Sequence, residues 1–373
     1  MAPPPSPPAL VIPSANEVSF GHLIGTVGRG TQRIRVSIDG RQVAERAVRG
    51  QRFDFSVVLP RHDVALTVTA VDGGGRRAST VVAPVYGLPR SAAPRGPPPS
   101  GFEETRLART IRALAHAFPS TSAIFIQDLR DGAGAAWNAR ARLPAASTLK
   151  VAIAVEVLRA LDGKPAAGTR LDRLVRRMLE SSDSKAANEL LVWLGGSTSS
   201  GSARVNASMR ALGLTDTDMY GGYELPRSTA GHSRKPIPLR VESQPSFVGK
   251  YTTAWDYGRL LRYLHLATAG KGALAQRFRG SLAPPEARYL LYVLAHTAEP
   301  NRLDRYLRGG GVAVLQKAGW IEPARHDGGL IYWPGGAFVA VVMTWNGHGT
   351  GTSSDVLAGR VARAALERFQ QRG

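Results

Sequence analysis

A proline-rich segment at residues 89–100 divides this chain into two regions with different hydrophobic periodicity. The segment holds prolines at five positions when read from Leu88 and has no apolar repeat, and this composition predicts a stiff, extended linker. Before it, at residues 14–88, apolar and polar residues alternate as in β-strands. After it, at residues 101–373, the helical period dominates. The sequence therefore predicts two domains of different fold class joined by a linker.

The first region predicts a small all-β sandwich. Alternating runs occur at Ile34–Ile38, Phe53–Leu59 and Val64–Val68, with turn signals at Asp39-Gly40 and Asp72-Gly73. In this pattern it resembles the immunoglobulin-like modules of bacterial surface proteins. No residues in it form a recognisable chemical site, so we expect a spacer or wall-binding module, and specific ligand binding remains the alternative.

The second region mixes helices and strands, which predicts an α+β domain with an antiparallel sheet covered by helices. The glycine-rich stretch Gly195–Gly201 is not followed by G-K-[ST], and we expect a loop between helices there rather than a phosphate-binding loop. The predicted helices are Glu103–Phe118, Ser147–Leu161, Arg170–Glu180, Ser184–Leu194, Thr252–Leu266 and Ser353–Phe369, and the predicted strands are Ala123–Leu129, Val312–Lys317, Gly329–Trp333 and Ala337–Trp345.

The chain is strongly basic, but its charge is not gathered in one place. It has 48 Lys and Arg against 28 Asp and Glu, a formal charge of +20. Residues 1–95 hold 12 of the basic and 6 of the acidic residues, so both regions carry the excess. An even distribution favours a generally cationic surface, suited to peptidoglycan or another anionic wall polymer, over nucleic-acid binding.

Several classes of site are excluded by composition. There is no cysteine, so disulfides, thiol nucleophiles and cysteine-ligated zinc are ruled out, and the eight histidines show no metal-binding spacing. We expect a monomer without metal or cofactor. No apolar run approaches the ~18 residues of a membrane-spanning helix. Met1–Pro13 lacks a signal-peptide pattern but resembles the trimmed end of an exported protein, so we expect export to the periplasm, wall or medium.

The first candidate catalytic residues are Ser147 and Lys150. Positions three apart lie on one face of a helix, so the lysine could take the proton of the serine hydroxyl and make it a nucleophile. The apolar residues 151–155 that follow would bury the start of this helix. Alone, S-x-x-K is a weak motif.

Two further motifs follow in order: Ser182-Asp183-Ser184 and Lys317-Ala318-Gly319-Trp320. With them, residues 102–371 resemble the penicillin-recognising serine hydrolases, most closely the class A β-lactamases, whose marks are S-x-x-K, S-D-N and K-T-G. Met178–Ser181 before the second motif, Leu194-Gly195-Gly196 after it and Ala211–Leu214 agree with that family, as does Arg325-His326-Asp327 before a strand.

The resemblance implies a role for each position. Ser147 is the acylated nucleophile and Lys150 its proton partner. Ser182 relays a proton to the leaving nitrogen, and Lys317 attracts the substrate carboxylate. Ser184, Ala318, Gly319 and Trp320 line the substrate site, and the backbone N–H groups of Ser147 and of the strand near Trp320 form the oxyanion hole.

Three departures from the family pattern affect the substrate and the turnover. Ser184 stands where the family has Asn, and Ala318 where it has Thr or Ser. The segment between the first two motifs is shorter, and residues 220–250 are longer and rich in Pro, Gly and Ser. Class A enzymes deacylate with a Glu placed four residues before an Asn. Glu224 is the candidate here, but the fourth residue after it is Ser228 instead of Asn.

The resemblance therefore implies a serine hydrolase that is acylated on Ser147 by β-lactams and hydrolyses the amide bond of the β-lactam ring, and the three departures lead us to expect slow turnover. Two alternatives stay open. One is a penicillin-binding-protein-like D-alanyl peptidase or esterase, and the other is a non-catalytic wall-binding protein of the same fold.

Overall fold

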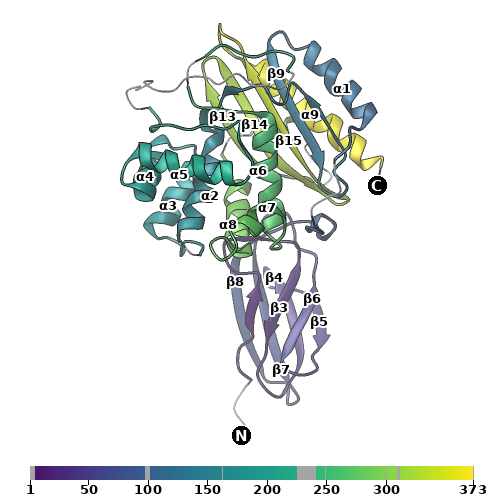
Figure 1. Cartoon of the computed structure of the whole chain (residues 1–373). Coiled ribbons are helices and arrows are strands. Elements are labelled where there is room, and N and C mark those ends of the chain that lie inside the picture. Colours follow the sequence, from purple (N-terminus) through teal and green to yellow (C-terminus); the bar gives the residue numbers. More distant parts are fainter. Residues whose placement is uncertain are drawn as a thin grey trace. The chain divides into compact units, whose positions relative to one another are not determined.

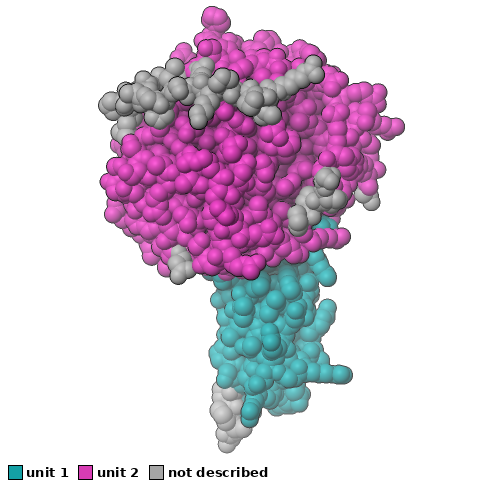
Figure 2. Space-filling model, viewed as in Figure 1, with its two compact units in different colours: residues 1–93 teal, residues 94–373 magenta. Residues whose placement is uncertain are grey.

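The computed structural model of the protein describes residues 5–96, 101–161, 163–224, 241–247, 249–298, 300–307, 309 and 311–372. The chain forms two compact units, Met1–Ala93 and Pro94–Gly373, coloured separately in Figure 2. The boundary between the units falls within the segment predicted as a linker. There the residues Arg90–Ala92 form a short 3₁₀ turn, η1.

The first unit is a sandwich of two sheets, which fits an immunoglobulin-like domain. Alternate residues of β4, such as Ile34 and Val36, are fully buried in its core, and Val36 lies opposite Val68 of β7. β1 lies before residue 14, so the sandwich begins earlier than the predicted bounds of 14–88. One sheet contains β1 (Ala9–Ile12), β3 (His22–Thr26) and β6 (Arg52–Ser56); the other contains β2 (Glu17–Ser19), β8 (Arg77–Gly87), β7 (Asp63–Asp72), β4 (Thr31–Ile38) and β5 (Arg41–Ala47).

The second unit is built on a five-stranded antiparallel sheet, which confirms the predicted α+β class. Its strand order is β10 (Gly134–Trp137), β9 (Thr121–Asp128), β15 (Gly336–Trp345), β14 (Ala324–Trp333) and β13 (Ala313–Ile321). The strand β13 is an edge strand of this sheet.

Helices cover both faces of the sheet (Figure 1). Ile124 and Ile126 of β9 pack in one cluster with α1 (Thr105–His116) and α9 (Thr352–Gln370). Phe125 between them lies against Gly258 of α6 (Ala254–Ala267), where an added Cβ would be 2.2 Å from its ring. Because successive residues of a strand point to opposite faces, α6 covers the face opposite α1 and α9.

The remaining helices form a group beside the sheet: α2 (Lys150–Leu161), α3 (Arg170–Glu180), α4 (Ser184–Gly195), α5 (Thr198–Ala211), α7 (Gly272–Arg277) and α8 (Pro284–Ala295). Its centre is α2, which is buried from Lys150 to Leu158. A helix that is buried on all sides is apolar all round, as residues 151–155 are.

The prediction of a loop at Gly195–Gly201 was wrong for most of its length. Gly196 ends α4 in a left-handed conformation, with φ of +79°, and Ser197 caps α5 by accepting a hydrogen bond from the Ser200 N–H at 3.1 Å. Only these two residues separate the helices, because the glycine and the serine serve as a C-cap and an N-cap in succession.

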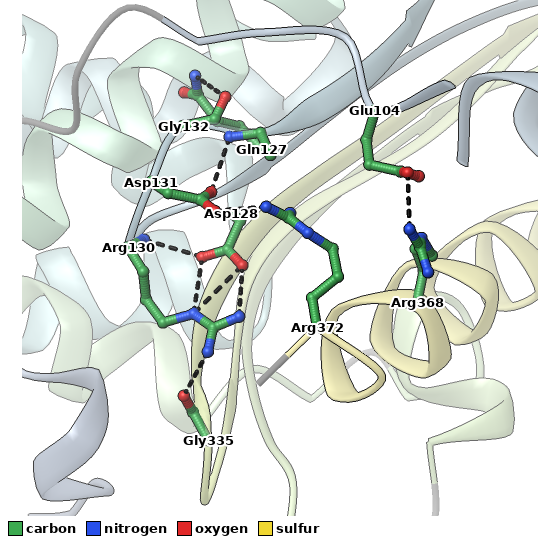
Figure 3. Close-up of polar contacts among 10 residues, drawn as sticks. Glu104, Gln127, Asp128, Arg130, Asp131, Gly132, Gly335, Arg368 and Arg372 are labelled. Atoms are coloured by element: carbon green, nitrogen blue, oxygen red, sulfur yellow. Dashed lines mark hydrogen bonds and ion pairs between the residues drawn. The ribbon is translucent and has the colours of Figure 1, made fainter. Parts of the chain in front are cut away.

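Ion pairs fix the C-terminal helix to the start of the unit (Figure 3). Arg368 of α9 donates to Glu104 at 2.9 Å, and Arg372 donates to Asp131 at 2.5 Å. The Glu104 side chain also caps α1 by accepting from the Leu107 N–H at 2.6 Å. The two ends of the second unit are thereby held together at one end of the sheet.

Candidate active site

Ser147 lies in a tightly fixed turn that leads into α2. The turn is the 3₁₀ segment η2 (Ala146–Leu149). Ala145 before it donates its N–H to the Lys250 carbonyl at 2.9 Å and accepts from the Thr148 hydroxyl at 2.6 Å. Ala146 has φ of +47°, a conformation that side chains rarely adopt and that functional sites often retain. The serine is therefore presented at the start of a buried helix, as predicted, but from a 3₁₀ turn.

Lys150 connects the first motif with the second. Its side chain is fully buried, and its Nζ donates to the Ser182 carbonyl at 2.5 Å and to the Ser184 hydroxyl at 3.3 Å. The structure thus brings together three predicted residues that are 32 and 34 positions apart in the sequence. Ser184, which stands in place of an amide side chain, contacts Lys150 directly.

Asp183 positions the two serines on either side of it. Its side chain accepts from the Lys185 and Ala186 N–H groups at 2.8 and 3.0 Å and so caps α4. Arg177 of α3 pairs with the same carboxylate. The backbone hydrogen bond from Ala186, aided by Arg177, lowers the pKa of Asp183, so the cap stays ionised. Ser182 has φ of +59° at the turn into this helix.

The third motif lies on the edge strand β13, against the turn that holds Ser147. A Cβ added to Gly319 would lie 2.9 Å from the Ser147 nitrogen and 3.1 Å from the Ala146 Cβ. Only glycine allows the strand to come this close to the turn. Lys317, two residues earlier on the same face of the strand, is fully buried, and Ala318 is buried too. Trp320 is 57% exposed, at the open side of the site.

Two buried side chains, Tyr257 and His326, stabilise the contact between β13 and the turn that holds Ser147. The Tyr257 hydroxyl of α6 donates to the Lys317 carbonyl at 2.8 Å. His326, which pairs with Gly319 across β13 and β14, donates from Nε2 to the Pro144 carbonyl at 2.6 Å and accepts at Nδ1 from the Thr344 N–H at 3.1 Å. Burial lowers the pKa of His326 to about 4, so the ring is neutral at neutral pH and serves as a fixed brace.

A loop at residues 218–224 is bound to α4 and α5 and contacts Lys150 through Tyr223. Asn206 holds the Met219 backbone through bonds of 2.7 and 2.9 Å, and Ser202 donates to the Gly221 carbonyl at 2.7 Å. Asn188 holds Tyr223 in the same way, with bonds of 2.9 Å to its carbonyl and 2.7 Å from its N–H. The loop is thus anchored by side chains of two helices.

Glu224, the tentative deacylating base, is exposed at the end of this loop and has φ of +53°. The residue before it, Tyr223, is the one that lies against Lys150, with 4.7 Å between the lysine Nζ and the ring centroid. A role for Glu224 stays a prediction. Residues 225–240, most of the segment predicted to be remodelled, lie outside the described residues.

Sequence reasoning missed Asn188 and Tyr223, although one signal was available. Asn188 follows Ser184 by four residues, so it lies one turn further along the same face of α4 and points to the same side as the site. Tyr223, which Asn188 binds from 35 positions away, has no such signal in the sequence.

No metal-binding group of three acidic or histidine side chains occurs among the described residues. In the same part of the chain, no helix is both long and apolar enough to cross a membrane. The arrangement is that of a hydroxyl, an amine and backbone N–H groups around one turn, which suits covalent catalysis at a serine.

Comparisons with known proteins agree on the family and the fold of the second unit. Residues 106–168 and 162–369 match the family model described as the β-lactamase enzyme family. A variant of PBP-A, solved as an acyl-enzyme complex with penicillin G, is 20% identical with a TM-score of 0.57, covering 73% of this chain and 99% of its own.

Two class A β-lactamases show the same fold. An ancestral enzyme is 21% identical with a TM-score of 0.55, covering 70% of this chain and 100% of its own. The enzyme from Mycobacterium abscessus is 19% identical with a TM-score of 0.54, covering 71% of this chain and 99% of its own. No curated protein matches the chain.

Proposed function

The chain belongs to the β-lactamase enzyme family, and from this premise we propose that it is a serine hydrolase acylated on Ser147 by β-lactams. The observation that carries the proposal is the junction at the η2 turn. There Lys150 bonds to the Ser182 carbonyl and the Ser184 hydroxyl, while Gly319 of β13 lies against the Ser147 nitrogen.

In this proposal the Ser147 hydroxyl oxygen attacks the lactam carbonyl carbon and Lys150 takes its proton. The carbon–nitrogen bond of the ring then breaks, and the nitrogen receives a proton through the Ser182 hydroxyl. The N–H groups of Ser147 and Trp320 stabilise the negative charge that develops on the carbonyl oxygen. Glu224 is the proposed base for hydrolysis of the ester.

Charge and shape in the site support an anionic substrate. Lys150 and Lys317 are both fully buried at this junction, and a cation in a poorly solvated site attracts a carboxylate more strongly than one in water. We assign Lys317 to the substrate carboxylate. Ala318, Gly319 and the exposed Trp320 form the strand along which the substrate lies, with Ser184 opposite them.

The test is covalent labelling. A fluorescent penicillin should give one adduct by intact-mass spectrometry, mapped to Ser147, and Ser147→Ala should abolish it. Ser181→Ala is the matched control, because Ser181 is exposed and bonds only to the Arg177 carbonyl among the contacts described. A persisting adduct in Ser147→Ala would refute the assignment.

The second candidate is a penicillin-binding-protein-like D-alanyl peptidase or esterase. It is favoured by the finding that the loop residue against Lys150 is Tyr223 rather than a carboxylate. A peptide ending in D-alanyl-D-alanine, assayed beside the penicillin, separates the two: cleavage of the peptide with a stable penicillin adduct supports the peptidase.

We also propose that the protein acts outside the cytoplasm as a monomer, without metal or cofactor, and that peptidoglycan or another anionic wall polymer is a partner. Support comes from the net charge of +20, which is shared by both units. Sedimentation of the protein with isolated wall material, and its loss from the pellet at high salt, tests this partner.

A further inference from the structure

Three loops at one end of the first unit share an unusual composition. They connect β3 to β4, β5 to β6 and β7 to β8. Their sequences are VGRGT at residues 27–31, VRGQR at residues 48–52 and DGGGRR at residues 72–77. Each loop contains both arginine and glycine, and the only acidic residue in the three is Asp72. We call these three loops the arginine end of the first unit.

The three loops are held beside one another by contacts around Gln32. The Val27 N–H donates to the Gln51 carbonyl at 2.9 Å, and the Val48 N–H donates to the Gln32 carbonyl at 2.9 Å, which joins the first loop to the second. The third loop approaches the same residue, because a Cβ added to Gly73 would lie 2.8 Å from the Gln32 side-chain nitrogen. The arginine end is therefore one continuous surface.

Each loop turns at a glycine in the left-handed conformation. Gly30 and Gly50 have φ of +84°, and Gly75 has φ of +79°. A Cβ added to any of the three would meet no atom within 4 Å, so glycine is needed here for the turn and not for close packing. Arg29 and Arg49 directly precede two of these glycines and are exposed. The loop tips are thus open to solvent and present arginine.

The charge of the arginine end is not neutralised within the unit. Asp72 is engaged in its own loop, where it pairs with Arg76 at 2.7 Å and accepts from the Gly74 N–H at 2.9 Å. The other arginines of the three loops are exposed and have no carboxylate partner in the part of the chain that the structure describes: Arg29, Arg49, Arg52 and Arg77. Such a group of like charges attracts anions.

The opposite end of the same sandwich has charges of both signs. Asp39 and Arg41 lie at the turn between β4 and β5, and Arg61 and Asp63 lie where the chain enters β7. The positive charge is shared evenly between the two units, but within the first unit it is concentrated at one end. This concentration was not visible in the sequence, because the three loops are separated by 17 or more residues.

We propose that the arginine end binds an anionic wall polymer through oxyanion groups that recur along it, either phosphate or carboxylate. The inference rests on the wall polymer proposed as a partner and assigns the surface that binds it. A guanidinium donates two parallel hydrogen bonds, which match the oxygens of either group. None of the three loops contains an aromatic residue on which a nucleic-acid base could stack, which favours a wall polymer over single-stranded nucleic acid.

The test removes the four exposed charges from the full-length protein. The loop variant combines Arg29→Gln, Arg49→Gln, Arg52→Gln and Arg77→Gln. Its Kd for the polymer that the wild type binds should rise by about 10²-fold, and its plot of log affinity against log salt should become shallower by about 3, since each contact contributes about 0.7. Calorimetry with polyphosphate and with polygalacturonate of matched length shows whether phosphate or carboxylate is the preferred group.

The matched control removes the same number of charges from the second unit. It replaces by glutamine four exposed arginines of α1 and α9: Arg106, Arg109, Arg112 and Arg360. Both variants lose four of the positive charges that give the formal +20. The control should bind within about threefold of the wild type, because a charge that is not in contact with the polymer is screened by salt. Thermal unfolding shows that both variants are folded.

Three results would overturn the inference. Unchanged affinity in the loop variant would show that the loops do not bind the polymer. Equal weakening in the loop variant and the control would show that net charge alone is responsible. Tighter binding of the wild type to a DNA duplex than to either polymer would make nucleic acid the partner.

Sedimentation with isolated wall material separates this inference from the proposed partner. If the wild type does not sediment with the wall, the proposed partner itself fails. If the wild type and the loop variant sediment equally, the partner stands and the assignment of the arginine end fails. We expect the wild type and the control to sediment and the loop variant to remain in solution.

Discussion

The two units of the protein differ in how much charge they bury. The core of the first unit is apolar, around residues such as Ile34, Val36 and Leu66. Among the described residues, the first unit fully buries one charged side chain, that of Glu17, whereas the second fully buries four: Asp128, Lys150, Glu156 and Lys317. A buried charge costs free energy that an apolar side chain of the same size does not. The second unit therefore gives up more folding free energy to buried charge than the first does.

Within the second unit, the buried charges fall into two groups. Glu156 of α2 bonds to Arg159 at 2.7 Å, to Arg204 at 3.1 Å and to the Ser208 hydroxyl at 2.5 Å, and so joins α2 to α5. Lys150, six residues before it, donates to a carbonyl and a hydroxyl and lies on a ring. The first arrangement holds helices together, and the second places the Lys150 amine against the Ser182–Ser184 turn.

The largest effect is expected from removing the amine. Lys150→Met keeps most of the buried volume but cannot accept the Ser147 proton, so acylation by penicillin should slow by about 10²–10⁴-fold. The adduct is followed by fluorescence and the fold by thermal unfolding. Lys185→Met is the control, because Lys185 is an exposed lysine of the same motif region. An unchanged acylation rate would mean that another group takes the proton.

The next effect is expected in the first unit and concerns stability alone. Leu66 of β7 is fully buried, and Leu66→Ala should lower the free energy of unfolding of this unit by about 2–5 kcal/mol. Acylation of Ser147 should not change, since the residues proposed for acylation all lie in the second unit. Val58→Ala, at a side chain that is 91% exposed, is the control for the unfolding measurement. Slower acylation in the folded Leu66→Ala protein would show that the first unit affects the proposed site in the second.

Much of the fold was predictable because its signals are local. The helix Arg170–Glu180 has the bounds predicted for it, since Thr169 caps it and its apolar residues recur at the helical period. The boundary between all-β and α+β regions was visible in the change of period. The loop prediction for Gly195–Gly201 was wrong, because glycine and serine occur at helix caps as well as in loops.

The site was predictable to the extent that it is built from motifs. Lys150 does meet the Ser182-Asp183-Ser184 motif, and β13 does approach Ser147. The contact of Tyr223 with Lys150 depends on a hydrogen-bonded pair 35 residues apart and on the path of a loop. Such a contact has no periodic or local signature, so only the structure shows it.

A pH effect of moderate size is expected at Asp256, below the site on α6. Its carboxylate accepts from the Asp216 N–H at 2.8 Å and the Thr217 hydroxyl at 3.1 Å, and burial raises its pKa to about 6. A raised pKa means that the folded protein binds this proton more tightly than the unfolded chain. The stability from this group is therefore full below about pH 4 and lost as the pH rises through 6.

Asp256→Asn should remove that dependence. The difference in unfolding free energy between wild type and variant should change by about 2–3 kcal/mol between pH 4 and pH 8, measured by urea denaturation. The buried histidines His265 and His326, whose pKa values burial lowers, act in the opposite direction but are present in both proteins and cancel. Parallel curves for the two proteins would show that Asp256 titrates normally.

The smallest effect is expected at the Glu104–Arg368 pair, which joins α1 to α9 at one end of the sheet (Figure 3). The hydrogen bond from Arg368 lowers the pKa of Glu104 to about 2, so its stabilising effect is present above about pH 4.5 and lost as the pH falls through 2. Glu104→Gln should lower the Tm by about 2–4 °C at pH 7 and by less at pH 3.

Glu367→Gln, in the exposed pair with Arg363 on the same helix, should leave the Tm unchanged. Acylation should be untouched by both, because the Glu104–Arg368 pair joins α1 to α9 and includes none of the residues proposed for acylation. A fall in acylation with Glu104→Gln would show that this pair and the proposed site are coupled through the sheet.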